Sequence, residues 1–102
     1  MNKDEMVKIV ENKEEADRSQ KRNRLVKIAR TTLLGCAVHD EISHKYFSVS
    51  VKSDAGRAVF FIFPEQNTIS VYEQLGLGYA VRLAKAYESE KEQEFTIQKC
   101  YE

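Results

Sequence analysis

The hydrophobic residues of this chain change their period along its length, and that change constrains the fold more than any other feature. Residues 45–52 alternate between apolar and polar, which is typical of a half-buried strand. A continuous apolar run follows at 57–63, and residues 68–72 alternate again. Turn-forming residues separate these runs at 53–56 and 64–67. The pattern therefore predicts three antiparallel strands joined by tight turns.

Helical periods flank these strands. The first third contains neither Gly nor Pro before Gly35 and is rich in Glu, Lys, Arg, Ala and Leu, so we expect a helix that stops at Gly35. Apolar residues recur every four positions from Leu75 to Tyr87, which predicts a second helix over 76–91. A last short strand is expected near 95–98. The predicted fold is a single α+β domain of order α-β-β-β-α-β, with a small antiparallel sheet and both helices on one face.

Length and composition exclude several classes of protein. A chain of 102 residues forms one domain with one modest core, which excludes large multi-domain enzymes. The 16 Lys and Arg balance the 16 Asp and Glu, so global charge favours neither nucleic acid nor membrane. No apolar run reaches the roughly 18 residues of a membrane span, and the acidic N-terminus is unlike a signal peptide. We expect a cytoplasmic protein with two reduced thiols, Cys36 and Cys100, and no membrane contact.

Charge is distributed unevenly although its sum is zero. Residues 1–17 carry three lysines and six acidic side chains, whereas residues 18–30 carry six basic side chains and no acid. We interpret residues 1–20 as a charged helical appendage and 21–102 as the compact domain. The basic run is a candidate surface for an acidic or phosphate-bearing partner, or else a solvated face that pairs with the acids one turn away. Its members are Arg18, Lys21, Arg22, Arg24, Lys27 and Arg30.

The apolar run at 57–63 gives a second candidate site. If Val59, Phe61 and Phe63 face the helices, the alternate residues face away, and one helix layer cannot cover both sets. The outer sheet face would then be an apolar interface for a partner or for a second copy of the chain. Its predicted members are Tyr46, Phe60 and Ile62. In the alternative interpretation, the long N-terminal helix folds over that face.

The connection that begins at Cys36 concentrates chemically versatile side chains. Zinc binds thiols and imidazoles, and Cys36, His39, His44 and Cys100 would supply four ligands, but their spacing lacks the ligand pairs of zinc motifs. Cys36, His39 and Asp40 would act as nucleophile, base and orienting carboxylate only within hydrogen-bond reach of one another. We therefore expect no metal, no cofactor and no catalytic residue.

Residues 73–80 (EQLGLGYA) place a GxG motif at the start of the second helix, where backbone N–H groups can bind a phosphate. This segment resembles the pyrophosphate-binding turn of coenzyme A-dependent N-acetyltransferases, in which Arg or Gln stands three positions before GxG or GxA. The resemblance implies coenzyme A binding and acetyl transfer. Here Glu73 occupies the Arg or Gln position, and Gly76 and Gly78 would equally permit close packing of the helix on the sheet.

The order α-β-β-β-α is also that of double-stranded-RNA-binding domains, and RAVFFIF at 57–63 resembles an aromatic RNA-binding strand.

We expect a small non-enzymatic regulatory or inhibitory accessory protein of a bacterium, phage or mobile element. It would bind a protein or nucleoprotein partner, and it could form a homodimer. One alternative is a nucleic-acid-binding protein that uses the basic helix at 18–30. The other is a small coenzyme A-dependent acetyltransferase-like protein.

Overall fold

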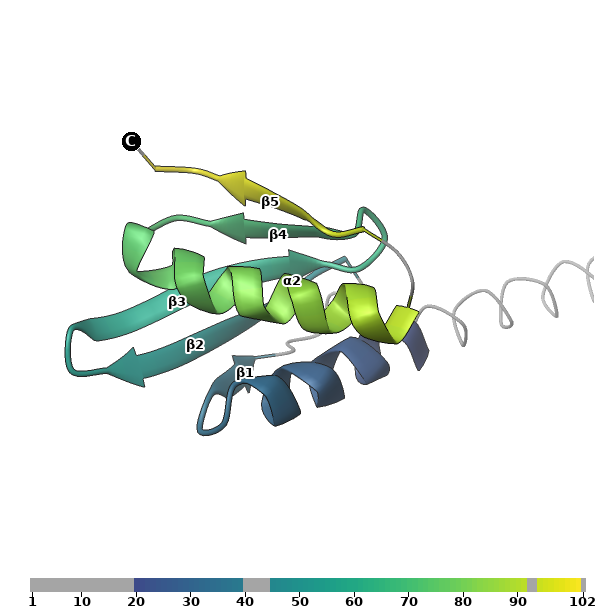
Figure 1. Ribbon diagram of the computed structural model, residues 1–102, viewed down its shortest axis with the longest axis horizontal. Coiled ribbons are helices and arrows are strands. Elements are labelled where there is room, and N and C mark those ends of the chain that lie inside the picture. The colour runs from purple at the N-terminus through teal and green to yellow at the C-terminus, as the bar shows by residue number, and fades with distance from the viewer. Residues whose placement is uncertain (1–19, 40–44, 92–93, 102) are drawn as a thin grey trace, which may run out of the picture.

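The computed structural model describes residues 20–39, 45–91 and 94–101, and these residues form two helices and a five-stranded sheet (Figure 1). In chain order the elements are a helix at 20–32, β1 (Ala37–His39), β2 (Phe47–Ser53), β3 (Gly56–Phe63), β4 (Thr68–Val71), the short 3-10 turn η1 (Gln74–Gly76), α2 (Leu77–Lys91) and β5 (Thr96–Lys99). The α+β class that the sequence predicts is confirmed.

The strands lie in the order β1-β2-β3-β4-β5. Neighbours from β1 to β4 are antiparallel. The prediction of an antiparallel sheet is wrong for β5, which runs parallel to β4 because α2 carries the chain back across the sheet. The strand β1 was not predicted. Its three residues are too few to show an alternation, and only pairing of Ala37 with Ser50 and of His39 with Ser48 makes it a strand.

Both helices lie over the same face of the sheet, as predicted (Figure 1). The helix at 20–32 points Leu25, Ala29 and its neighbour Leu33 into the core, and α2 contributes Leu83 and Tyr87. The first helix ends where expected, with Gly35 at a φ of +82°, a conformation that favours glycine. Among the described helices, none combines the length and the apolarity needed to cross a membrane.

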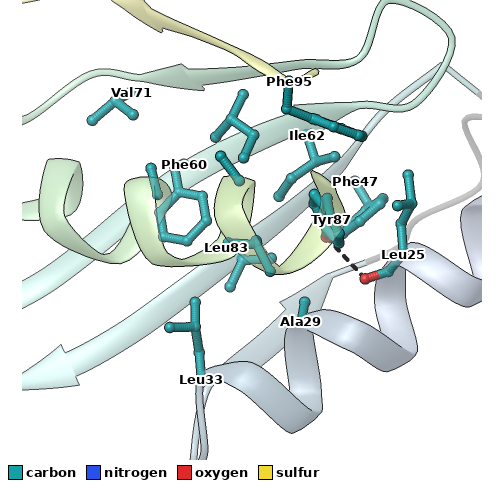
Figure 2. Close-up of a cluster of buried hydrophobic side chains, with 14 of the residues drawn as sticks. Leu25, Ala29, Leu33, Phe47, Phe60, Ile62, Val71, Leu83, Tyr87 and Phe95 are labelled. Carbon is teal, nitrogen blue, oxygen red and sulfur yellow. Dashed lines mark hydrogen bonds between the residues drawn. The ribbon is translucent and has the colours of Figure 1, made fainter. Parts of the chain in front are cut away.

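The core fills the space between the helices and the inner face of the sheet (Figure 2). Phe47, Phe60 and Ile62 from the sheet are fully buried, and each such side chain contributes about 1.5–3 kcal/mol by leaving water. The Tyr87 hydroxyl donates a hydrogen bond of 2.9 Å to the backbone carbonyl of Leu25, drawn as a dashed line in Figure 2. This bond satisfies a buried polar group and ties the two helices together.

The predicted facing of β3 is wrong by one residue. Phe60 and Ile62 face the helices and are fully buried, whereas Phe61 faces away from them. The reason is the register with β2, which pairs Phe47 with Ile62. Residues paired across two strands share a face, so the inward position of Phe47 forces Ile62 inward as well.

Candidate interaction surfaces

Four aromatic rings meet on the sheet face that the helices leave uncovered. We call Tyr46, Phe61, Phe63 and Tyr72 the aromatic cluster. The ring of Tyr46 lies 5.9 Å from that of Phe61 and 5.7 Å from that of Phe63, and the rings of Phe61 and Tyr72 lie 5.4 Å apart. These centroid distances are those of favourable edge-to-face and tilted aromatic contacts.

The backbone places these rings by simple alternation. Phe61 and Phe63 occupy the outward positions of β3 because Phe60 and Ile62 occupy the inward ones. Tyr46 directly precedes β2 and Tyr72 directly follows β4, so both extend the outward rows of their strands. The two phenylalanines are half-buried by their neighbours, whereas Tyr46 is 42% exposed and Tyr72 is 49% exposed. The cluster is therefore ordered by its own contacts but still open to solvent.

The charge of this face is one-sided. Lys52 and Arg57 pair across β2 and β3 at outward positions, and both are exposed. Within the described strands, no outward position holds Asp or Glu. The outer sheet face is consequently aromatic and apolar at its centre, with positive charge at one end.

A shallow polar hollow adjoins the aromatic cluster. It lies over β4 and β5, where the hydroxyl of Ser70 donates a 3.2 Å hydrogen bond to Oε1 of Gln98. Hydroxyl, amide and thiol groups therefore lie directly beside the rings. The residues that line the hollow are Phe63, Gln66, Thr68, Ser70, Tyr72, Gln98 and Cys100.

The structure corrects the membership of the predicted apolar interface. Tyr46 lies on the outer face as predicted. Phe60 and Ile62 belong to the core instead, because the β2 register turns them toward the helices. Tyr72 was not among the predicted members, although it follows the inward Ile69 and Val71 of an alternating run and must therefore face outward.

The basic side chains of the predicted run differ in their exposure. Arg24, Lys27 and Arg30 are exposed on the outward side of their helix. Lys21 is part-buried, and its Nζ donates a 3.0 Å hydrogen bond to Oδ1 of Asn67 in the turn between β3 and β4. Arg22 is half-buried. The remaining predicted member, Arg18, lies outside the described residues.

Two further cations, which were not among the predicted site residues, belong to the same face of the molecule. Arg82 and Lys85 are exposed on α2, opposite the buried Leu83 and Tyr87 of that helix. The signal was available in the sequence, since both residues fall on the polar side of the predicted helical period. We call Arg24, Lys27, Arg30, Arg82 and Lys85 the basic helix surface. It lies on the face opposite to the aromatic cluster.

The thiols and histidines do not converge within the described residues. Cys36 precedes β1 and Cys100 follows β5, at opposite edges of the sheet, so four strand spacings of about 4.8 Å separate them by roughly 19 Å. Cys36 packs against the core, whereas His39 lies on the other face of β1. No group of three or more potential metal ligands forms in the described ranges, and Asp40 and His44 lie outside them.

The pKa of Cys36 argues against a nucleophilic role. Burial raises the pKa of this thiol, and the nearby Arg30 guanidinium offsets only part of the rise. Its Sγ donates a long hydrogen bond of 3.7 Å to the backbone carbonyl of Ala29. A protonated, packed thiol is a poor nucleophile.

The GxG segment forms a closed turn. The N–H of Gly76 donates a 3.0 Å hydrogen bond to the carbonyl of Glu73, and the N–H of Leu77 bonds to the carbonyl of Gln74. Two donors that a pyrophosphate would need are therefore already used within the turn. Glu73 is exposed directly before this turn, so its negative charge disfavours a phosphate there.

Comparison with protein-family models, curated proteins and solved structures gives no match for this chain. Function is therefore inferred from the two surfaces, of which one is aromatic and the other is basic.

Proposed function

We propose that this protein is a non-enzymatic accessory protein that binds a protein partner through its outer sheet face. The observation that carries the proposal is the aromatic cluster, which lies on a face that no other described element covers. Tyr46 and Tyr72 expose nearly half of their surface there. Contiguous exposed apolar surface of this kind marks interaction sites, and the centres of protein interfaces are enriched in Tyr and Phe and depleted in Asp and Glu.

Charge defines the chemistry of the partner. Lys52 and Arg57 leave the face positive at one end, and the described outward positions supply no carboxylate to balance them. The complementary surface is an apolar centre with acidic residues at its rim. A second copy of this chain fits that description poorly, because the described outward strand positions of its own sheet would bring two more cations and no acid. The proposed partner is therefore a different protein, whose binding surface has an apolar centre and an acidic rim.

The polar hollow adds specificity to the apolar centre. A side chain that enters it beside Tyr72 can exchange hydrogen bonds with the Ser70 hydroxyl and the Gln98 amide. A buried ring contact surrounded by such polar contacts is the arrangement that concentrates binding energy in a few residues. Phe61 is the central ring of the cluster, with contacts to both tyrosines, so we expect its loss to cost the most affinity.

Binding of this kind would act sterically, by occupying a surface that the partner uses for something else. Regulation or inhibition is therefore the proposed role. The cytoplasm is the expected compartment, since Cys36 and Cys100 are free thiols.

Site-specific photo-crosslinking in cells of the source organism tests the proposal. A benzophenone side chain replaces Tyr72 on the aromatic cluster or, as a matched control, Leu34, which is 85% exposed at the end of the first helix. We expect a discrete adduct with another protein from position 72 and none from position 34. The adduct partner is then identified, purified and titrated against the wild-type chain and Phe61→Ser by calorimetry, and we expect an affinity loss of at least about tenfold.

Several outcomes would overturn the proposal. These are adducts that form equally well from position 34, a covalent dimer of this chain as the main product, the absence of any adduct, and a purified partner that binds Phe61→Ser as tightly as wild type. The dimer outcome would assign the face to a second copy instead.

A further inference from the structure

We infer that the basic helix surface binds the phosphate backbone of a nucleic acid. This surface lies opposite to the aromatic cluster, so binding there is additional to the proposed binding of a protein. It would make the protein a two-sided adaptor, with a protein on the sheet and a nucleic acid on the helices.

Three of the cations follow one another along the outward side of the first helix. Arg24, Lys27 and Arg30 are spaced three residues apart, so each lies about 4.5 Å further along the helix axis than the one before. All three are exposed, and within the described chain none of them forms an ion pair. Among the described residues, no ion pair therefore neutralises these three charges.

The second helix adds two more cations beside those of the first helix. Arg82 and Lys85 are exposed on α2, which packs beside the first helix through the hydrogen bond from Tyr87 to Leu25. The two helices together present five cations on one face, while the whole chain carries a formal net charge of zero. On the described helices these five cations stand against one exposed carboxylate, that of Glu90.

A groove between the two helices supplies the other groups that phosphates bind. It has a volume of ≈ 550 Å³ and contains hydroxyl groups beside two of the cations. Arg and Lys side chains together with Ser and Thr hydroxyls make most contacts to phosphate oxygens in nucleic-acid complexes. The residues lining the groove are Arg24, Lys27, Ile28, Thr31, Thr32, Ala86, Ser89 and Glu90.

The composition of this face favours a nucleic acid over an acidic protein. A protein interface needs an apolar centre, and the apolar side chains of the groove are only Ile28 and Ala86. Leu34 is exposed past the end of the first helix, where it lines a second, shallow hollow with Lys27 and Arg30, but it is a single aliphatic side chain. The aromatic cluster, which could anchor a protein, lies on the opposite face.

One carboxylate in the groove opposes phosphate binding, so its removal should raise the affinity where removal of a cation lowers it. Glu90 is exposed and lines the groove together with Arg24 and Lys27. Removing its charge should strengthen binding of a polyanion. A variant that gains affinity cannot be explained by damage to the fold.

Fluorescence anisotropy with the full chain and a labelled 20-base-pair duplex DNA tests the inference, with single-stranded DNA and RNA of equal length as further arms. We expect binding that weakens between 50 and 200 mM salt, with a slope of log K against log salt of about −2 to −4.5 if two to five cations contact phosphates. The double variant Arg24→Glu, Lys27→Glu should lose at least about tenfold in affinity, and Glu90→Gln should gain about two- to fivefold.

The control is the double variant Lys52→Glu, Arg57→Glu, which makes the same change in net charge on the sheet face. We expect it to retain wild-type affinity for the duplex within about threefold. Absence of binding to all three nucleic acids at 50 mM salt would overturn the inference. Equal losses in the two double variants, or no change in Glu90→Gln, would overturn the assignment of the site. None of these results bears on Phe61→Ser, so failure here and failure of the proposed function are distinguishable.

Discussion

Phe60 and Phe61 are consecutive residues of β3 that lie on opposite faces of the sheet. Phe60 is fully buried beneath the helices, whereas Phe61 contacts Tyr46 and Tyr72 on the outer face. One of the two rings therefore belongs to the core and the other belongs to the proposed binding surface.

This relationship predicts opposite behaviour of two adjacent alanine variants. Phe60→Ala should lower the free energy of unfolding by about 3–5 kcal/mol, because it removes a buried ring and leaves a cavity. Phe61→Ala should lower it by about 1 kcal/mol, since it loses only half-buried ring contacts. Urea denaturation followed by circular dichroism measures both. Equal losses, or a larger loss for Phe61→Ala, would contradict the assignment of the two faces.

The hydrogen bond from Tyr87 to Leu25 predicts a modest stability contribution at neutral pH. Tyr87→Phe keeps the buried ring and removes only the hydroxyl, so the free energy of unfolding should fall by about 0.5–1.5 kcal/mol. Equilibrium urea denaturation at pH 7 measures the difference. A variant as stable as wild type would show that the bond contributes nothing net.

The same residue predicts a loss of stability at alkaline pH. Burial raises the pKa of Tyr87 above its ordinary value of about 10, and the nearby Cys36 raises it further. As the pH rises, the unfolded chain therefore loses this proton before the folded chain does. The contribution of the Tyr87 hydroxyl to the free energy of unfolding is fully present below about pH 10 and falls by about 1.4 kcal/mol per pH unit above it. The difference in unfolding free energy between wild type and Tyr87→Phe should shrink accordingly between pH 9.5 and 11. A difference that stays constant over this range would show that the Tyr87 hydroxyl is not buried in the folded protein.

Hydrophobic period predicts a strand's facing only where the two faces of the strand differ. In β2 the inward Phe47 and Val49 alternate with serines, so the facing follows from the sequence. In β3 both sets are apolar, and period cannot choose between Phe60 and Phe61. Pairing with β2 makes that choice, and pairing register is a long-range property that one segment does not contain.

The candidate surfaces could be predicted only in part for a related reason. Tyr46 and the cations of the first helix were identifiable because each belongs to one regular segment. Arg82 joins Arg24 on one face only because α2 packs against the first helix through Tyr87 and Leu25. A site built from two elements requires their packing, which single-segment patterns do not describe.

The two cysteines should react at different rates with a thiol reagent. Cys100 is exposed, whereas Cys36 is partly buried and its pKa is raised by that burial, so less of it is thiolate at pH 7.5. We expect one fast and one slow phase with Ellman's reagent. Cys100→Ser should remove the fast phase and Cys36→Ser the slow one. A fast Cys36 would show an activated thiol and would reopen the catalytic interpretation.

Gly78 distinguishes a structural turn from a phosphate site. A Cβ at this position would meet no atom within 4 Å, and the residue lies in the first turn of α2. Gly78→Ala should therefore raise the free energy of unfolding by up to about 1 kcal/mol, because alanine loses less conformational entropy in a helix. Thermal denaturation measures the change.

Isothermal calorimetry with acetyl-coenzyme A is the companion experiment. Glu73 and the occupied N–H of Gly76 predict no binding to wild type or to Gly78→Ala. Binding to wild type that Gly78→Ala abolishes would instead establish the coenzyme A interpretation.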